Sequence, residues 1–184
     1  MNYGLVFKNE HSYKDHGLIM QSIDRALLPM VKRQQVDIPS LDGKYDLQAN
    51  ALYDDRLITV RFSSVVTDMF DMQAKKRKIA KWLSGRSRLI FDDEPGLWND
   101  AKVFDAVAFE QTFKTLSVEA IFEAYPFAYG KEIRIPVNAP VAIKMSYAGN
   151  ARTPTKITLK NTSNVNISGL SVTAILRVSG RGTA

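Results

Sequence analysis

The chain has 184 residues, of which 45% are hydrophobic and 24% charged, a composition that supports a packed core and excludes global disorder. It contains no cysteine, which excludes disulfides, thiolate nucleophiles and cysteine zinc sites. No apolar run reaches the roughly 20 residues of a membrane span and no signal-peptide pattern opens the chain, so we predict a soluble protein without membrane insertion, made in a cytoplasm.

The first part of the chain predicts short strands and one projecting arm. Residues 1–7 and 17–20 are typical of short strands, and the polar segment 9–15 between them indicates a turn. Residues 32–53 contain two alternating segments around an Asp42-Gly43 turn signal, which predicts a long β-hairpin. Much of this arm is polar, so we expect it to lie against its own domain or a neighbouring chain.

The clearest strand covers residues 57–66 and runs into a helix that begins after Asp68 and ends at Ser84-Gly85. An apolar stripe on this helix, which includes Met69, should pack on a sheet. A short strand over 89–91 then stops at an acidic turn. The residues expected to anchor the core are Phe62, Met72, Ile79, Trp82, Leu83, Ile90, Phe91 and Phe122.

Two further strands are expected over 101–109 and 116–125. Together these elements predict a mainly β fold, a mostly antiparallel sheet or sandwich with one packed α-helix, ending near Pro126. Residues 131–184 contain one aromatic residue, Tyr147, and too few large side chains for a stable core of their own. Short strands are expected there around Ile133, Ile135, Ile157, Leu159, Ile167, Leu170, Val172 and Ile175.

The sequence shows no catalytic machinery. His11 and His16 are the only histidines, and they lack the three or four convergent ligands of a metal site. The acids at 92–94 are adjacent and precede Pro-Gly, which is typical of a solvated turn rather than a catalytic carboxylate pair. No nucleophile elbow, phosphate-binding loop or dinucleotide fingerprint occurs. We therefore expect no enzyme activity, no cofactor and no metal.

The net charge of +6 leaves nucleic acid open as a partner. More than half of this excess comes from the basic helix, with its cluster from Lys75 to Lys81, and from Arg86 and Arg88 beside it. No base-stacking aromatic is interleaved with the cluster, because Trp82 belongs to the apolar stripe. A solvated or interface face is therefore the favoured interpretation.

A series of short segments occurs in a characteristic order between residues 3 and 128. They are Tyr3-Gly4-Leu5-Val6-Phe7, His16-Gly17-Leu18, Asp24-Arg25, Leu28-Pro29, Val36-Asp37-Ile38-Pro39, Asp42-Gly43-Lys44-Tyr45-Asp46, Tyr53-Asp54-Asp55-Arg56, Ile79-Ala80-Lys81-Trp82-Leu83-Ser84-Gly85, Leu89-Ile90-Phe91-Asp92-Asp93-Glu94-Pro95 and Phe122-Glu123-Ala124-Tyr125-Pro126-Phe127-Ala128. In this order they resemble the distal tail proteins of long-tailed bacteriophages, over about residues 1–130.

The resemblance implies a structural virion protein, assembled in the host bacterial cytoplasm. Its N-terminal domain, residues 1–130, is expected to be a β-sandwich with one packed α-helix and a projecting β-hairpin arm. Six copies would close into a ring that joins the tail tube to the tail tip or baseplate, next to the tape-measure protein, with DNA passing through the lumen. Residues 149–159 resemble the start of the family's C-terminal galectin-like domain, so residues 131–184 are expected to be a reduced or partial version. The residues expected at subunit or tube contacts are Lys32, Val36, Ile38, Asp42, Lys44, Tyr45, Arg61, Lys75 and Lys78, together with the edge of the 57–66 strand.

Two other functions stay open on the sequence. A carbohydrate- or receptor-binding module could use the β-rich part after residue 130, although sugar binding commonly needs exposed aromatic residues and Tyr147 is the only one there. A nucleic-acid-binding protein could use the basic helix.

Overall fold

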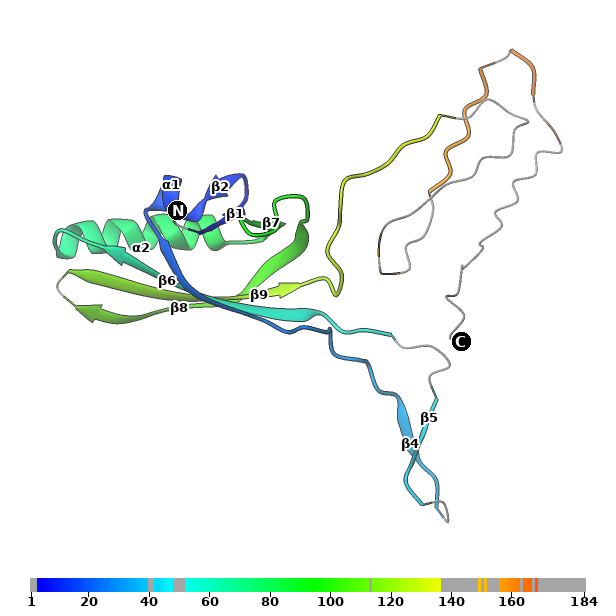
Figure 1. Cartoon of the computed structure of the whole chain (residues 1–184), viewed down its shortest axis with the longest axis horizontal. Coiled ribbons are helices and arrows are strands. Elements are labelled where there is room, and N and C mark those ends of the chain that lie inside the picture. Colours follow the sequence, from blue (N-terminus) through cyan, green and yellow to red (C-terminus); the bar gives the residue numbers. More distant parts are fainter. Residues whose placement is uncertain are drawn as a thin grey trace, which may run out of the picture. The chain divides into compact units, whose positions relative to one another are not determined.

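The computed structural model describes residues 3–39, 42–47, 52–112, 114–136, 149, 151, 156–162, 164–166 and 168. The chain divides into two units, Met1–Ile143 and Lys144–Ala184. All helices and strands assigned to described residues belong to the first unit (Figure 1). The predicted domain division near residue 130 stays a prediction.

Seven strands form one antiparallel sheet in the order β2-β1-β7-β8-β9-β6-β3 (Figure 1). The predicted mainly β class is confirmed, and two helices accompany the sheet among the described residues. The sheet strands are β1 (Leu5–Phe7), β2 (Glu10–His11), β3 (Ile19–Arg25), β6 (Arg56–Val65), β7 (Arg86–Phe91), β8 (Asn99–Thr112) and β9 (Thr115–Ala124), and the helices are α1 (Ser12–His16) and α2 (Met69–Leu83).

Alternating side chains give β6 and β9 a buried face and a polar face. Ile58, Val60 and Phe62 are buried on β6, and each lies opposite a buried residue of β9 in the register, Phe122 pairing with Ile58. Because side chains alternate with a period of two, this register places both apolar rows on the same side of the sheet. The strands predicted over 57–66 and 116–125 are confirmed within one residue at each end.

The helix α2 begins and ends where the sequence predicts. The Asp68 side chain accepts a hydrogen bond of 2.8 Å from the Asp71 backbone amide, which caps the first turn. Gly85, just beyond the helix, has φ +83°, the left-handed conformation expected of the exit glycine. Met69 differs from the prediction, because it lies in the first turn at the margin of the buried stripe and its side chain is exposed.

Trp82 joins the helix to several strands. Its indole Nε1 donates a 2.8 Å hydrogen bond to the Phe7 carbonyl, and its ring stacks on His16 at 4.5 Å.

The sheet curves over the core. The ring centres of Phe7 and Phe122 lie 5.4 Å apart, although two strands separate β1 from β9 in the sheet. A flat sheet would hold such strands about 14 Å apart. The strands therefore form one sheet that curves over the core instead of two separate sheets.

The N-terminal segment differs from the predicted turn over 9–15. Lys8 and Asn9 adopt positive φ and reverse the chain between β1 and β2, and α1 follows at once. His11 caps α1, since its Nδ1 accepts hydrogen bonds from the amides of Tyr13 and Lys14 at 3.0 and 3.3 Å. Histidine is not among the favoured capping residues, so the sequence carried no signal for this helix.

The expected core residues are buried with one exception. Ile90 is half-buried on the opposite face of β7, because its neighbours Leu89 and Phe91 take the two inward positions of the strand. The buried members of the expected set are Phe62, Met72, Ile79, Trp82, Leu83, Phe91 and Phe122.

The described residues after 130 contain no assigned strand. Ile133, Ile135, Ile157 and Leu159, each expected in a short strand, are exposed. Further predictions fall outside the described residues, namely those on Tyr147, Ile167, Leu170, Val172 and Ile175 and on part of the 149–159 segment.

Candidate assembly surfaces

A hairpin arm, residues 26–55, connects β3 to β6. Its outer part consists of β4 (Gln35–Asp37) and β5 (Lys44–Asp46), which pair antiparallel with Val36 opposite Tyr45. Gly43 has φ +85°, a conformation that glycine adopts without strain, next to Asp42 in the turn. The hairpin predicted over 32–53 is confirmed.

The two stems of the arm are held together by backbone hydrogen bonds. The Lys32 amide donates to the Leu52 carbonyl at 2.8 Å, and the Asp54 amide donates to the Met30 carbonyl at 2.7 Å. At the root, the Arg56 guanidinium donates to the carbonyl of Ala26. These hydrogen bonds pair the described parts of the two stems and fix the root of the arm.

The acidic turn that follows β7 anchors two neighbouring segments. Arg25, at the end of β3, pairs with Asp93 and Glu94, and its guanidinium lies 4.7 Å from the centre of the Phe91 ring. Asp92 accepts a 2.9 Å hydrogen bond from the Gly4 amide, and its Oδ2 lies 3.1 Å from His11 Nε2. The three carboxylates therefore hold the acidic turn against the end of β3 and against the segment around Gly4 and His11. The sequence did not reveal this structural role.

The arm exposes most of its large apolar side chains. Leu27 is 95% exposed, although leucine is ordinarily a core residue. The arm's pairing strands, β4 and β5, have three residues each, and an isolated two-stranded hairpin is marginally stable in water at best. The apolar residues exposed along the arm are Leu27, Leu28, Met30, Val31, Val36, Ile38, Leu47 and Leu52.

The residues expected at interfaces lie on three different surfaces. Lys32, Val36, Ile38, Asp42 and Lys44 are exposed on the arm, and the backbone of Tyr45 belongs to β5. Arg61 lies on the sheet face that α2 does not cover, where its Nε is 2.5 Å from Glu119 Oε2, and this pairing raises the pKa of Arg61. Lys75 and Lys78 are on α2.

The predicted free edge of the 57–66 strand is wrong. β6 pairs with β3 on one side and β9 on the other, so its backbone groups are already used. β2 and β3 end the order of the sheet instead. The β3 edge carries a register shift between Met20 and Ser22 and presents Asp24, features that discourage unspecific strand pairing.

Part of the basic cluster on α2 serves the fold of its own domain. The ammonium groups of Lys75 and Lys78 donate to the carbonyls of Val65 and Asp15, at 3.0 and 2.6 Å. These two lysines therefore tie α2 to the end of β6 and to α1. This use of the charges weakens the nucleic-acid interpretation, which needs them available for phosphates.

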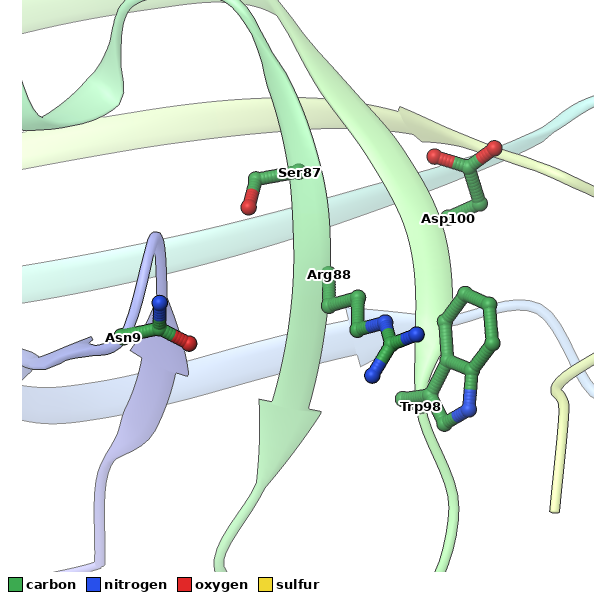
Figure 2. Close-up of a pocket in the computed structure, with 5 residues that line it drawn as sticks. All are labelled: Asn9, Ser87, Arg88, Trp98 and Asp100. Carbon is green, nitrogen blue, oxygen red and sulfur yellow. The ribbon is translucent and has the colours of Figure 1, made fainter. Parts of the chain in front are cut away.

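An open pocket of about 470 Å³ lies on the sheet and is lined by Asn9, Ser87, Arg88, Trp98 and Asp100 (Figure 2). The Arg88 guanidinium lies 4.5 Å from the centre of the Trp98 ring, and Tyr129 stacks on the same ring at 4.5 Å. Both partners occupy the ring, which leaves little of it for stacking against a sugar. The pocket therefore does not favour the carbohydrate-binding interpretation.

Both histidines make contacts within the fold, His11 as the cap of α1 and His16 with Glu10. His16 is 4% exposed, with its Nε2 2.6 Å from Glu10 Oε2, and burial lowers the pKa of His16 although Glu10 opposes the shift. Among the described residues, no cluster of three or more His, Cys, Asp or Glu side chains could hold a metal ion. No helix in this part of the chain is long and apolar enough to span a membrane.

The chain belongs to the phage tail proteins with a RIFT-related domain, because residues 13–119 match that family. Its fold is also similar to the crystal structure of the Dit protein of phage SPP1, described as a paradigm of the hub adsorption apparatus in phages that infect Gram-positive bacteria. The TM-score is 0.59 at 14% identity, with 71% of this chain and 53% of that chain covered. The match thus spans about half of the SPP1 protein. No curated protein sequence matches the chain.

These findings confirm the resemblance to distal tail proteins inferred from the sequence motifs. The chain is a structural component of a phage tail, and hence of the virion.

Proposed function

We propose that copies of this chain, six in number as the family resemblance implies, close into a ring between the tail tube and the tail tip or baseplate. The ring acts as an assembly hub that contacts the tube, tape-measure and tip proteins and lets DNA pass through its lumen. It is assembled in the cytoplasm of the host bacterium. The observation that carries the proposal is the exposed apolar surface of the arm.

The exposed apolar side chains of the arm carry a free-energy cost in water. Apolar area left in water forfeits roughly 25 cal/mol per Å², so eight exposed large side chains on a thin extension favour a partner. A ring requires that one patch meets a different patch on the next copy. The arm projects from one end of the β3–β6 pair and so offers a surface distinct from the core-covering helix and the sheet faces.

The test is the assembly state of the purified protein, measured by native mass spectrometry and negative-stain electron microscopy. We expect the wild-type chain to form closed rings and the Leu27→Ser/Leu28→Ser variant to be mainly monomeric. Ile133→Ser, which changes another exposed apolar residue outside the arm, is the matched control and should leave rings intact. Removal of residues 39–44 should also weaken the ring.

A wild-type protein that stays monomeric at high concentration and does not join purified tail tubes would contradict the proposed function. Rings that survive both arm variants unchanged would remove the arm from the interface.

A further inference from the structure

Arg88, an exposed residue of β7, carries a charge that its own domain does not neutralise. Its Cα lies opposite Asp100 in the register of β7 and β8, yet the Asp100 carboxylate pairs with Arg86 at 3.0 Å. In the described part of the chain, the Arg88 guanidinium forms neither an ion pair nor a hydrogen bond. It lies instead 4.5 Å from the centre of the Trp98 ring, where it lines the open pocket (Figure 2).

The Trp98 ring that supports Arg88 is itself held in place. Tyr129 stacks on it at 4.5 Å, and the backbones of the two residues exchange hydrogen bonds of 2.9 and 2.7 Å. A guanidinium that stacks on an aromatic ring keeps its N–H edge available, and this edge can pair bidentately with a carboxylate. Because Arg88 is already positioned, less conformational entropy is lost when a ligand binds. Arg88 is therefore a preorganised contact for an anion.

The charges around the pocket favour a ligand with a single negative charge. Arg86 and Arg88 contribute two positive charges and Asp100 one negative charge, which leaves a net charge of +1. Asp100 also lines the pocket, so a second negative charge on the ligand would be repelled by its carboxylate. A carboxylate therefore fits this surface better than a phosphate dianion.

Half-exposed aromatic and apolar residues lie beside the charged group. Tyr125 is 46% and Tyr129 38% exposed, with their ring centres 6.1 Å apart, and Leu97, the neighbour of Trp98 in sequence, is 40% exposed. Tyrosine and arginine are enriched at protein–protein contacts, where aromatic rings supply apolar area beside polar groups. A peptide that carries an apolar side chain next to its carboxylate could therefore contact both parts of this surface.

We propose that Arg88 binds the carboxylate of a glutamate or aspartate in a peptide segment of another protein, with the tyrosines in contact with an adjacent apolar residue of that peptide. The pocket volume of about 470 Å³ lies in the range of ligand sites and exceeds the size of one carboxylate. Asn9 and Ser87 lie on the opposite side of Arg88 from Trp98 (Figure 2), which leaves room for flanking residues of the peptide. The site needs one copy of this chain and is independent of the ring.

Trp98 fluorescence gives a readout at the site, because Trp98 is partly exposed there and the second tryptophan of the chain, Trp82, is buried. The probe is a blocked peptide with one glutamate beside a phenylalanine, titrated into the full chain. We expect a saturable change at low salt and a higher dissociation constant at high salt. Glutamine in place of the glutamate should raise the dissociation constant about ten-fold or more, because the charge-assisted hydrogen bonds are lost.

Variants of the protein separate the site from a general attraction to positive charge. Arg88→Gln should raise the dissociation constant of the glutamate probe about ten-fold or more. Arg88→Lys keeps the charge without the bidentate geometry and should raise it about three-fold. Lys76→Gln makes the same charge change on α2, outside the pocket, and should alter it less than about two-fold. Isothermal titration calorimetry measures the constants independently of Trp98, and circular dichroism checks the fold.

The outcomes test the site and its ligand separately from the ring. Equal affinity for the glutamate and glutamine probes, or no saturable binding, would overturn the proposal. Equal weakening by Arg88→Gln and Lys76→Gln would also overturn it, since net charge alone would then explain binding. Inorganic phosphate that binds as tightly as the glutamate probe would overturn the carboxylate assignment. A chain that binds the probe and forms no ring would defeat the proposed function and leave this site standing.

Discussion

The body of the protein and its arm are built on opposite principles. In the body, seven strands curve over α2 and bury a continuous core that contains Phe7, Phe62, Trp82 and Phe122. In the arm, two three-residue strands hold exposed apolar side chains in place with backbone hydrogen bonds. The body buries its apolar side chains within the chain, while the arm leaves apolar side chains exposed. This difference supports the proposal that the arm meets the next copy in the ring.

The largest effect should come from the centre of the body. Trp82→Ala should lower the free energy of unfolding by about 3–5 kcal/mol, because it removes a 97% buried ring together with its hydrogen bond to the Phe7 carbonyl. Urea denaturation of the monomer measures this loss. Trp98→Ala is the control and should cost less, since Trp98 is partly exposed. A loss below about 1 kcal/mol for Trp82→Ala would show that the helix is not anchored through this residue.

A smaller effect should appear as a dependence on pH. Burial lowers the pKa of His16 in the folded protein, so the unfolded chain binds more protons between that lowered pKa and the ordinary value of 6.5. The contribution of neutral His16 is therefore fully present above pH 6.5, and stability should fall as the pH drops from 7 towards 5. Glu10, Asp15 and Lys78 are the charged groups that act on this ring.

Urea titrations at several pH values test this slope, with His16→Phe as the comparison, because phenylalanine cannot be protonated and can still stack on Trp82. The variant should be less sensitive to pH between 7 and 5. An equal slope in both proteins would assign the dependence to another group.

The smallest effect on folding should come from the arm. Val36→Ser/Ile38→Ser should change the unfolding free energy of the monomer by less than about 0.5 kcal/mol, since both side chains are exposed and lie outside the core. The same change should weaken association of copies. Val60→Ser, in the buried row of β6, is the contrasting variant and should cost several-fold more. A large loss of monomer stability from the arm variant would mean that the arm packs on its own body.

The elements with strong local signals were predictable. Asp68 and Gly85 mark the ends of α2 because capping and left-handed exit are local chemistry. The alternating pattern of 57–66 gave β6, and the Asp42-Gly43 turn gave the hairpin. In each case the deciding interactions lie within a few residues of one another, which is the range that sequence patterns report.

Several of the misses depend on contacts between distant segments. Leu5 pairs with Phe91, and β3 pairs with β6 across the whole arm, so the position of β6 inside the sheet is invisible in its own sequence. The uses of Lys75 and Lys78 also follow from carbonyls brought near by folding.

The stems of the arm continue directly from β3 and β6, two neighbouring antiparallel strands. Hydrogen bonds between such strands run perpendicular to them. A force that pulls the arm along the strand axis would therefore act in shear on all the hydrogen bonds between β3 and β6 at the same time. Because β6 also pairs with β9, the hydrogen bonds between those two strands would carry part of the force. Such an attachment suits a part that must resist tension.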